Sequence, residues 1–127
     1  MPDPVTEPWY NETVTRIGAR NAQARAALVD RDAKRAGAIL AEAQPLAAKV
    51  LAAPRPTLAA MEAASDLDEL YGRLLVQWRE YGFARQTFQK NAARWKHWEP
   101  KTPDTERRLR AALDAIRECD RRIASQR

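Results

Sequence analysis

The residues of this chain that could do chemistry are few and widely separated. His97 is the only histidine and Cys119 the only cysteine. A zinc site needs several His, Cys or carboxylate ligands at defined spacing, and a Ser-His-Asp arrangement needs an acid that orients its histidine. His97 instead lies in a run of cations. We therefore expect no catalytic residue, no metal site and no cofactor, and we predict that the protein is not an enzyme.

A basic-aromatic segment at residues 83–98 is the strongest candidate for a binding surface. It combines cations with aromatic side chains and contains no acidic residue. Cations can neutralise phosphates and aromatic rings can stack on bases, while an acidic protein face would suit the same charges. In an alternative interpretation, the aromatic side chains pack the core and the cations face solvent. The candidate residues of this segment are Phe83, Arg85, Lys90, Arg94, Lys96, His97 and Trp98.

Two further groups extend the candidate surface. Val76 and Phe83 are seven residues apart and fall outside the main apolar stripe. They could form an exposed contact surface or pack against a third helix, and the sequence favours neither. Near the start of the last expected helix, positive charge opposes the helix dipole. The three arginines there are Arg107, Arg108 and Arg110. They could bind a phosphate or an acidic partner, or they could simply reflect an arginine-rich composition.

Charge is unevenly divided along the chain. Residues 1–82 contain 10 Lys/Arg and 11 Asp/Glu, whereas residues 83–127 contain 12 Lys/Arg and 6 Asp/Glu. The whole excess of positive charge therefore lies in the last third of the sequence. A localised basic surface favours an acidic partner, either a nucleic acid or an acidic protein face.

The hydrophobic pattern predicts an all-α protein, a bundle of four to five helices in a single domain over residues 1–127. Alanine occurs 25 times, which raises helix propensity, and no alternating strand pattern of useful length is present. One helix should begin between Thr6 and Thr13 and end near Val29, and a second should cover about 32–53. Thr102 and Pro103 form a good N-cap and first residue for the last helix.

A long helix at about 66–98 is the clearest element of the pattern, with Ser65 as its N-cap. Its apolar stripe recurs in steps of four and three, which makes Trp78 a core residue with a predicted cost of about 3–5 kcal/mol on replacement by alanine. A straight helix of this length would measure about 50 Å. We expect it either to project from the body or to bend near Gly82. The stripe consists of Leu67, Tyr71, Leu74, Trp78, Tyr81, Arg85, Phe88, Ala92 and Trp95, of which Arg85 is the only charged member.

These patterns predict a non-enzymatic protein–protein interaction module. It would be an adaptor, an assembly component or an inhibitor, of a kind that phage and mobile elements often encode. It would bind an acidic partner, or form a homo-oligomer, through the basic-aromatic end of the long helix. The alternative is a nucleic-acid-binding protein that uses the same face. No apolar run approaches the roughly 20 residues that span a bilayer and the N-terminus lacks a signal peptide, so we expect no membrane contact and a cytoplasmic location.

Overall fold

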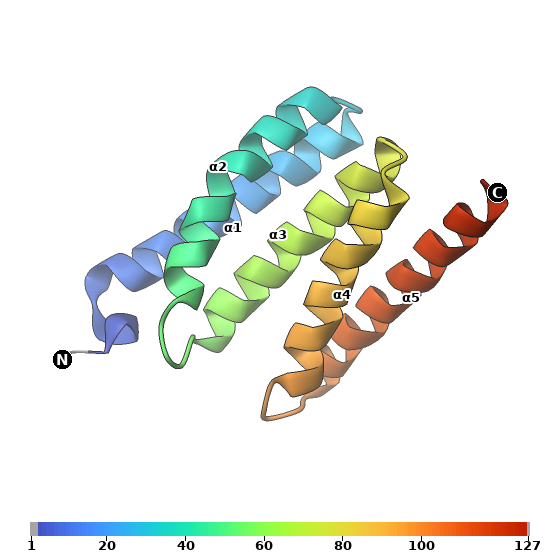
Figure 1. Ribbon diagram of the computed structural model, residues 1–127. Coiled ribbons are helices and arrows are strands. Elements are labelled where there is room, and N and C mark those ends of the chain that lie inside the picture. Colours follow the sequence, from blue (N-terminus) through green and yellow to red (C-terminus); the bar gives the residue numbers. More distant parts are fainter. Residues whose placement is uncertain (1–2, 127) are drawn as a thin grey trace. The chain divides into compact units, whose positions relative to one another are not determined.

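Residues 3–126 are described by a computed structural model, and their regular elements are all helical (Figure 1). The prediction of an all-α protein with four to five helices is confirmed. No strand occurs in this part of the chain. In order, the elements are the 3-10 helix η1 (Pro4–Thr6) and the α-helices α1 (Pro8–Val29), α2 (Ala33–Leu51), α3 (Leu58–Gln77), α4 (Tyr81–His97) and α5 (Pro103–Ser125).

The chain forms two compact units, the first ending at Leu70 and the second beginning at Tyr71. Helix α3 belongs to the first unit as far as Leu70, and its last two turns belong to the second. The expectation of a single folding domain stays a prediction. Across residues 3–126, no helix combines the length and the apolarity that crossing a bilayer requires.

Buried polar bonds join the helices of the first unit, in which α1 and α2 run antiparallel side by side (Figure 1). Tyr10 is fully buried, and its hydroxyl donates to the carbonyl of Val50 at 2.9 Å and accepts from the N–H of Thr57 at 3.3 Å. The side-chain amide of Asn21 donates to the carbonyl of Ala63 at 3.0 Å. These bonds tie α1 to the end of α2 and to α3, so they fix the register of the unit.

The second unit is built on α4, which packs against both the end of α3 and the antiparallel helix α5 (Figure 1). The ring of Phe88 lies directly over Gly72 of α3. Between α4 and α5, the guanidinium of Arg85 donates to Asp120 at 2.6 Å. The buried cluster at the centre of the unit consists of Leu75, Ala84, Phe88 and Cys119.

The expectation of one long helix at 66–98, straight or bent near Gly82, is wrong, because α3 ends before Trp78 and α4 begins at Tyr81. Arg79 has a φ of 59°, in the left-handed region. The N–H of Glu80 donates to the carbonyl of Leu75 at 2.8 Å, and the N–H of Arg79 donates to that of Val76 at 2.9 Å. This is the Schellman motif that commonly ends helices. It reverses the chain before Gly82, which lies in the first turn of α4, so the excess length disappears.

The same motif ends α1. Arg31 has a φ of 58°, and the N–H groups of Arg31 and Asp32 donate to the carbonyls of Leu28 and Ala27. At both connections the left-handed arginine precedes an acidic residue that is the N-cap of the next helix, Asp32 for α2 and Glu80 for α4. Glycine is the usual residue at this position, so an arginine there gives no recognisable stop signal in the sequence.

Two residues of the expected long helix also have different roles. Ser65 is not an N-cap, because α3 begins at Leu58, where the hydroxyl of Thr57 accepts from the N–H of Ala60 at 3.1 Å. Ser65 is instead buried inside the helix. Trp78 is not a core residue, since 48% of its surface is exposed. Helix α3 ends at Gln77, so the side chain of Trp78 no longer follows the stripe that predicted its burial.

We expect Arg79→Gly to raise the free energy of unfolding by about 0.5–1 kcal/mol. A left-handed backbone costs a side chain with a Cβ about 1–2 kcal/mol, and the greater freedom of glycine in the unfolded chain offsets part of the gain. Arg31→Gly should behave alike, whereas Arg25→Gly, inside α1, should lose about 1 kcal/mol. Urea unfolding measures all three, and a loss of stability at position 79 would contradict the assigned conformation.

Candidate functional site

The structure places the candidate residues of α4 on two faces. Phe83, Lys90 and Arg94 follow one another at spacings of seven and four, so they share one face of the helix. Arg85 lies about half a turn around the helix from Phe83 and bonds to Asp120 of α5. Lys96 lies three turns after Arg85 and shares this second face of α4. The basic-aromatic segment is therefore not one continuous surface.

Val76 and Phe83 are also separated. Val76 is half-buried and packs, together with Ala115 and Ile116 of α5, against the cluster around Phe88. Phe83 is 62% exposed. The sequence left two alternatives open for this pair. Val76 matches the packed alternative, and Phe83 matches the exposed one.

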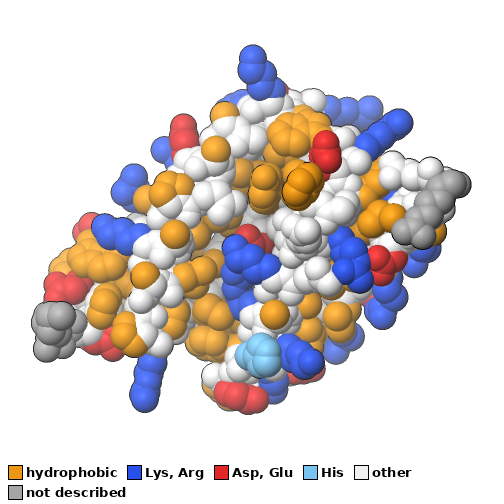
Figure 2. Space-filling model, viewed as in Figure 1, with side chains coloured by type: hydrophobic (Ala, Val, Ile, Leu, Met, Phe, Trp, Pro, Cys, Tyr) orange, Lys and Arg blue, Asp and Glu red, His pale blue; other side chains and the backbone are white. Residues whose placement is uncertain are grey.

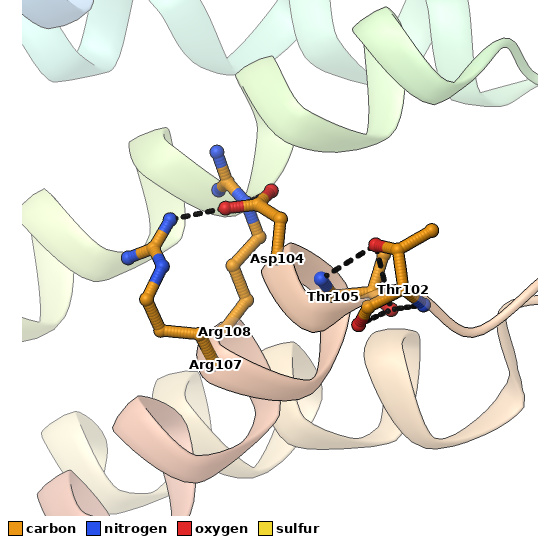
Figure 3. Close-up of polar contacts among 5 residues, drawn as sticks. All are labelled: Thr102, Asp104, Thr105, Arg107 and Arg108. Atoms are coloured by element: carbon orange, nitrogen blue, oxygen red, sulfur yellow. Dashed lines mark hydrogen bonds and ion pairs between the residues drawn. The ribbon is translucent and has the colours of Figure 1, made fainter.

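Two of the three arginines near the start of α5 are held by one carboxylate (Figure 3). Arg107 hydrogen-bonds to one oxygen of Asp104, and Nε of Arg108 donates to the other at 3.0 Å. These bonds, with Arg107 contributing most, lower the pKa of the Asp104 carboxyl below its usual value. The negative charge also offsets the unfavourable position of the arginines near a helix N-terminus. Arg110 is exposed and has no partner within residues 3–126.

The same close-up shows the cap of α5 (Figure 3). The hydroxyl of Thr102 accepts from the N–H of Thr105 at 3.1 Å, and the hydroxyl of Thr105 accepts from the N–H of Thr102 at 2.8 Å. This reciprocal pair forms a capping box. The prediction that Thr102 and Pro103 begin the last helix is confirmed.

The last turn of α4 is held by Lys101, which the sequence analysis did not single out. Its ammonium donates to the carbonyl oxygens of Trp95 at 2.9 Å, Lys96 at 2.6 Å and Trp98 at 2.6 Å. Carbonyls at a helix C-terminus lack partners inside the helix, and a cation there suits the helix dipole. Lys101 therefore closes this helix end.

The other candidates at this end are Trp98 and His97. Trp98 is half-buried and meets the ring of Trp95 edge-on, with 6.4 Å between the centroids. His97 is exposed. Figure 2 shows both basic and acidic side chains beside the single histidine. This end of α4 is therefore not purely cationic.

We expect Lys101→Met to lower the free energy of unfolding by about 1–2 kcal/mol, since hydrogen bonds from a charged donor to three carbonyls are lost from a partly exposed site. Lys96→Met is the matched control, because Lys96 is exposed and its side chain makes no bond within residues 3–126. It should change stability by less than about 0.5 kcal/mol. Thermal unfolding followed by circular dichroism compares the two, and equal effects would show that the Lys101 bonds contribute nothing.

The division of charge coincides with the division into units. From Tyr71 onward the sequence has 14 Lys/Arg and 7 Asp/Glu, a net charge of +7, whereas residues 1–70 have 8 Lys/Arg and 10 Asp/Glu, a net charge of −2. Among the described cations of the second unit, four are exposed and have no bonded partner in the described part of the chain: Arg73, Arg79, Lys96 and Arg110.

Three exposed aromatic side chains lie close together in the sequence of the second unit, and we call Tyr71, Trp78 and Phe83 the aromatic surface. Their exposed fractions are 36%, 48% and 62%. Tyr71 lies in the second-unit part of α3, and Trp78 directly follows the end of that helix. Figure 2 shows hydrophobic side chains at the surface over the end of α3 and the start of α4. Of the three, only Phe83 was a sequence candidate, because the other two belong to the stripe.

Contacts of α4 place Phe83 on the side of that helix away from α5. Tyr81, two residues before Phe83, lies with its ring centroid 5.9 Å from the guanidinium of Arg122 of α5. Arg85, two residues after Phe83, bonds to α5. Residues two apart in a helix point in nearly opposite directions, so Phe83 points away from α5. Trp78 lies in the turn that joins α3 to α4.

The chemistry that this surface offers is contact by aromatic and cationic groups. The thiol of Cys119 is buried in the cluster of the second unit, and burial raises its pKa, which keeps it protonated. Within residues 3–126, no three His, Cys, Asp or Glu side chains gather in a group that could hold a metal ion.

Comparison with known proteins gives no relative from which a function could be transferred. No protein-family model matches the chain, and neither a curated protein nor a solved structure matches it.

Proposed function

We propose that the protein is a non-enzymatic interaction module that binds an acidic partner protein through its second unit. The observation that carries the proposal is the coincidence of charge and structure, because the +7 net charge belongs to the unit that begins at Tyr71. A surface of one sign attracts a partner of the opposite sign and speeds encounter with it.

The arrangement of the cations favours a protein partner over a nucleic acid. Binding to a phosphate backbone needs a row of cations that are free to neutralise phosphates. Much of the positive charge of the second unit is already paired. The four exposed cations without a partner in the described chain come from α3, the α3–α4 turn, α4 and α5, so no single helix presents a row of them. The arginines paired with carboxylates of this unit are Arg85, Arg107, Arg108, Arg117, Arg121 and Arg122.

Native mass spectrometry of the protein purified from its own cells tests the proposal. At low salt we expect a retained protein with an acidic surface, and its retention should fall as salt rises, since exposed charges are screened over about 10 Å at 0.1 M salt. The double variant Lys96→Gln/Arg110→Gln should retain less partner than the matched Arg16→Gln/Arg25→Gln variant of the first unit.

Three results would overturn the proposed function. The protein could retain nothing at low salt, it could form only homo-oligomers, or it could retain nucleic acid in place of protein. The last result would establish the alternative that the sequence left open, and the salt dependence of the complex would then measure how many phosphates are contacted.

A further inference from the structure

We infer that the aromatic surface is the docking point for one kind of partner segment, an acidic stretch of protein that carries a large apolar side chain. The inference rests on the proposed function, because it assumes a protein partner. It goes further by locating the contact and by stating the chemistry that the partner must present.

The apolar part of the contact comes from Trp78 and Phe83. Both are large, and both are about half exposed or more. Trp78 is the first of the three residues that connect α3 to α4, and Phe83 lies in the first turn of α4. The backbone under this connection is held by the two Schellman hydrogen bonds. The rings of Trp78 and Phe83 therefore start from a backbone that is held in place, which lowers the entropy cost of binding.

The charged part of the contact comes from Arg79, which lies between the two aromatic residues. Arg79 is exposed and its side chain has no bonded partner in the described chain. Tryptophan, tyrosine and arginine are the residue types most enriched among those that dominate binding energy. A carboxylate on the partner would pair with Arg79 and would also be attracted by the +7 charge of the unit.

Charge favours an acidic protein segment over two other possible occupants, a second copy of the chain and a single-stranded nucleic acid. A second copy of the chain would bring another +7 unit against the first, and like charges oppose that contact. Single-stranded nucleic acid could stack on the rings, but its backbone needs several cations in a row. Residues 77–83 at this turn contain one cation, Arg79, which is fewer than a phosphate backbone needs. An acidic protein segment with one apolar anchor fits better than either.

A displayed library of random peptides, panned against the full chain, tests the inference. We expect the enriched peptides to carry a large apolar residue next to Asp or Glu. Trp78→Ser and Phe83→Ser should each weaken their binding by about tenfold or more, as loss of a dominant contact residue does. Val29→Ser is the matched control, because Val29 is 75% exposed but lies in the first unit. It should leave binding unchanged.

The left-handed arginines supply a second pair of matched variants. Arg79→Gly and Arg31→Gly should both stabilise the fold, so a loss of binding cannot be ascribed to unfolding. Only Arg79→Gly should weaken the selected peptides, and the difference should shrink at high salt.

Three outcomes would overturn the inference. Either no peptide is enriched, or the enriched peptides are neutral or basic, or they bind the Trp78 and Phe83 variants as well as the original chain. A thymidine homopolymer whose binding is abolished by the same two substitutions would reassign the surface to single strands. If mass spectrometry finds an acidic partner that both variants still bind, the docking point is wrong while the proposed function stands.

Discussion

Replacing Trp95 with alanine should lower the free energy of unfolding by about 3–5 kcal/mol, the cost of deleting a large aromatic side chain from a packed interior. Trp95 is fully buried. Its ring meets Trp98 edge-on, and the guanidinium of Arg108 lies 5.5 Å from its centroid. The substitution removes both contacts and leaves a cavity near the α4–α5 connection. Urea unfolding followed by far-ultraviolet circular dichroism measures the loss.

Trp78→Ala is the control for this prediction, since it deletes the same side chain from a position that is 48% exposed. We expect a loss of less than about 1 kcal/mol, because substitutions at exposed sites rarely cost more. Trp78 and Trp95 lie on the same apolar stripe of the sequence, and that stripe predicts that both are core residues. Equal losses would support the stripe and contradict the structure at Trp78.

The sequence was sufficient for those features that depend on local signals. Thr102 and Pro103 mark the start of α5, because a capping hydroxyl and a residue with fixed φ act within one turn. The all-α class follows from composition and periodicity, which are likewise local. The position of α1, from Pro8 to Val29, lies within the predicted range for the same reason.

The break between α3 and α4 was not predictable from local signals. Periodicity continues in phase across residues 78–80, because the stripe resumes at Tyr81 and Phe88 on the far side of the turn. The stop is made by a left-handed backbone at Arg79, and arginine adopts that conformation only where the rest of the fold holds it there. Glycine at position 79 would have revealed the stop.

The candidate surface was half predictable for a similar reason. Helical spacing shows which side chains share a face, so Phe83 was recognised as lying off the stripe. Spacing does not show which face a neighbouring helix covers, so Val76 could not be assigned to the buried cluster around Phe88. It also does not show which arginines are paired. Asp104 forms ion pairs with both Arg107 and Arg108 from one turn earlier in α5, and only the side-chain geometry reveals that both bonds form.

Replacing Gly72 with leucine should lower the free energy of unfolding by about 2 kcal/mol. A Cβ at this position would lie 2.5 Å from Cζ and 2.6 Å from Cε1 of Phe88. Phe88 is buried among Leu75, Ala84 and Cys119, so its ring has little room to move. Overpacking of this kind costs about 1–3 kcal/mol, while the better helix propensity of leucine returns up to about 1 kcal/mol.

Gly18→Leu makes the Gly72 prediction decisive, because the two substitutions should have opposite signs. Gly18 also lies inside a helix, but a Cβ there would have nothing within 4 Å. Only the propensity term remains, so stability should rise by about 0.5–1 kcal/mol. If both variants were stabilised, helix α3 could not approach Phe88 as closely as the structure shows. If Gly72→Leu is destabilising, adding Phe88→Leu should recover part of the loss, since the smaller side chain frees the space that the new one needs.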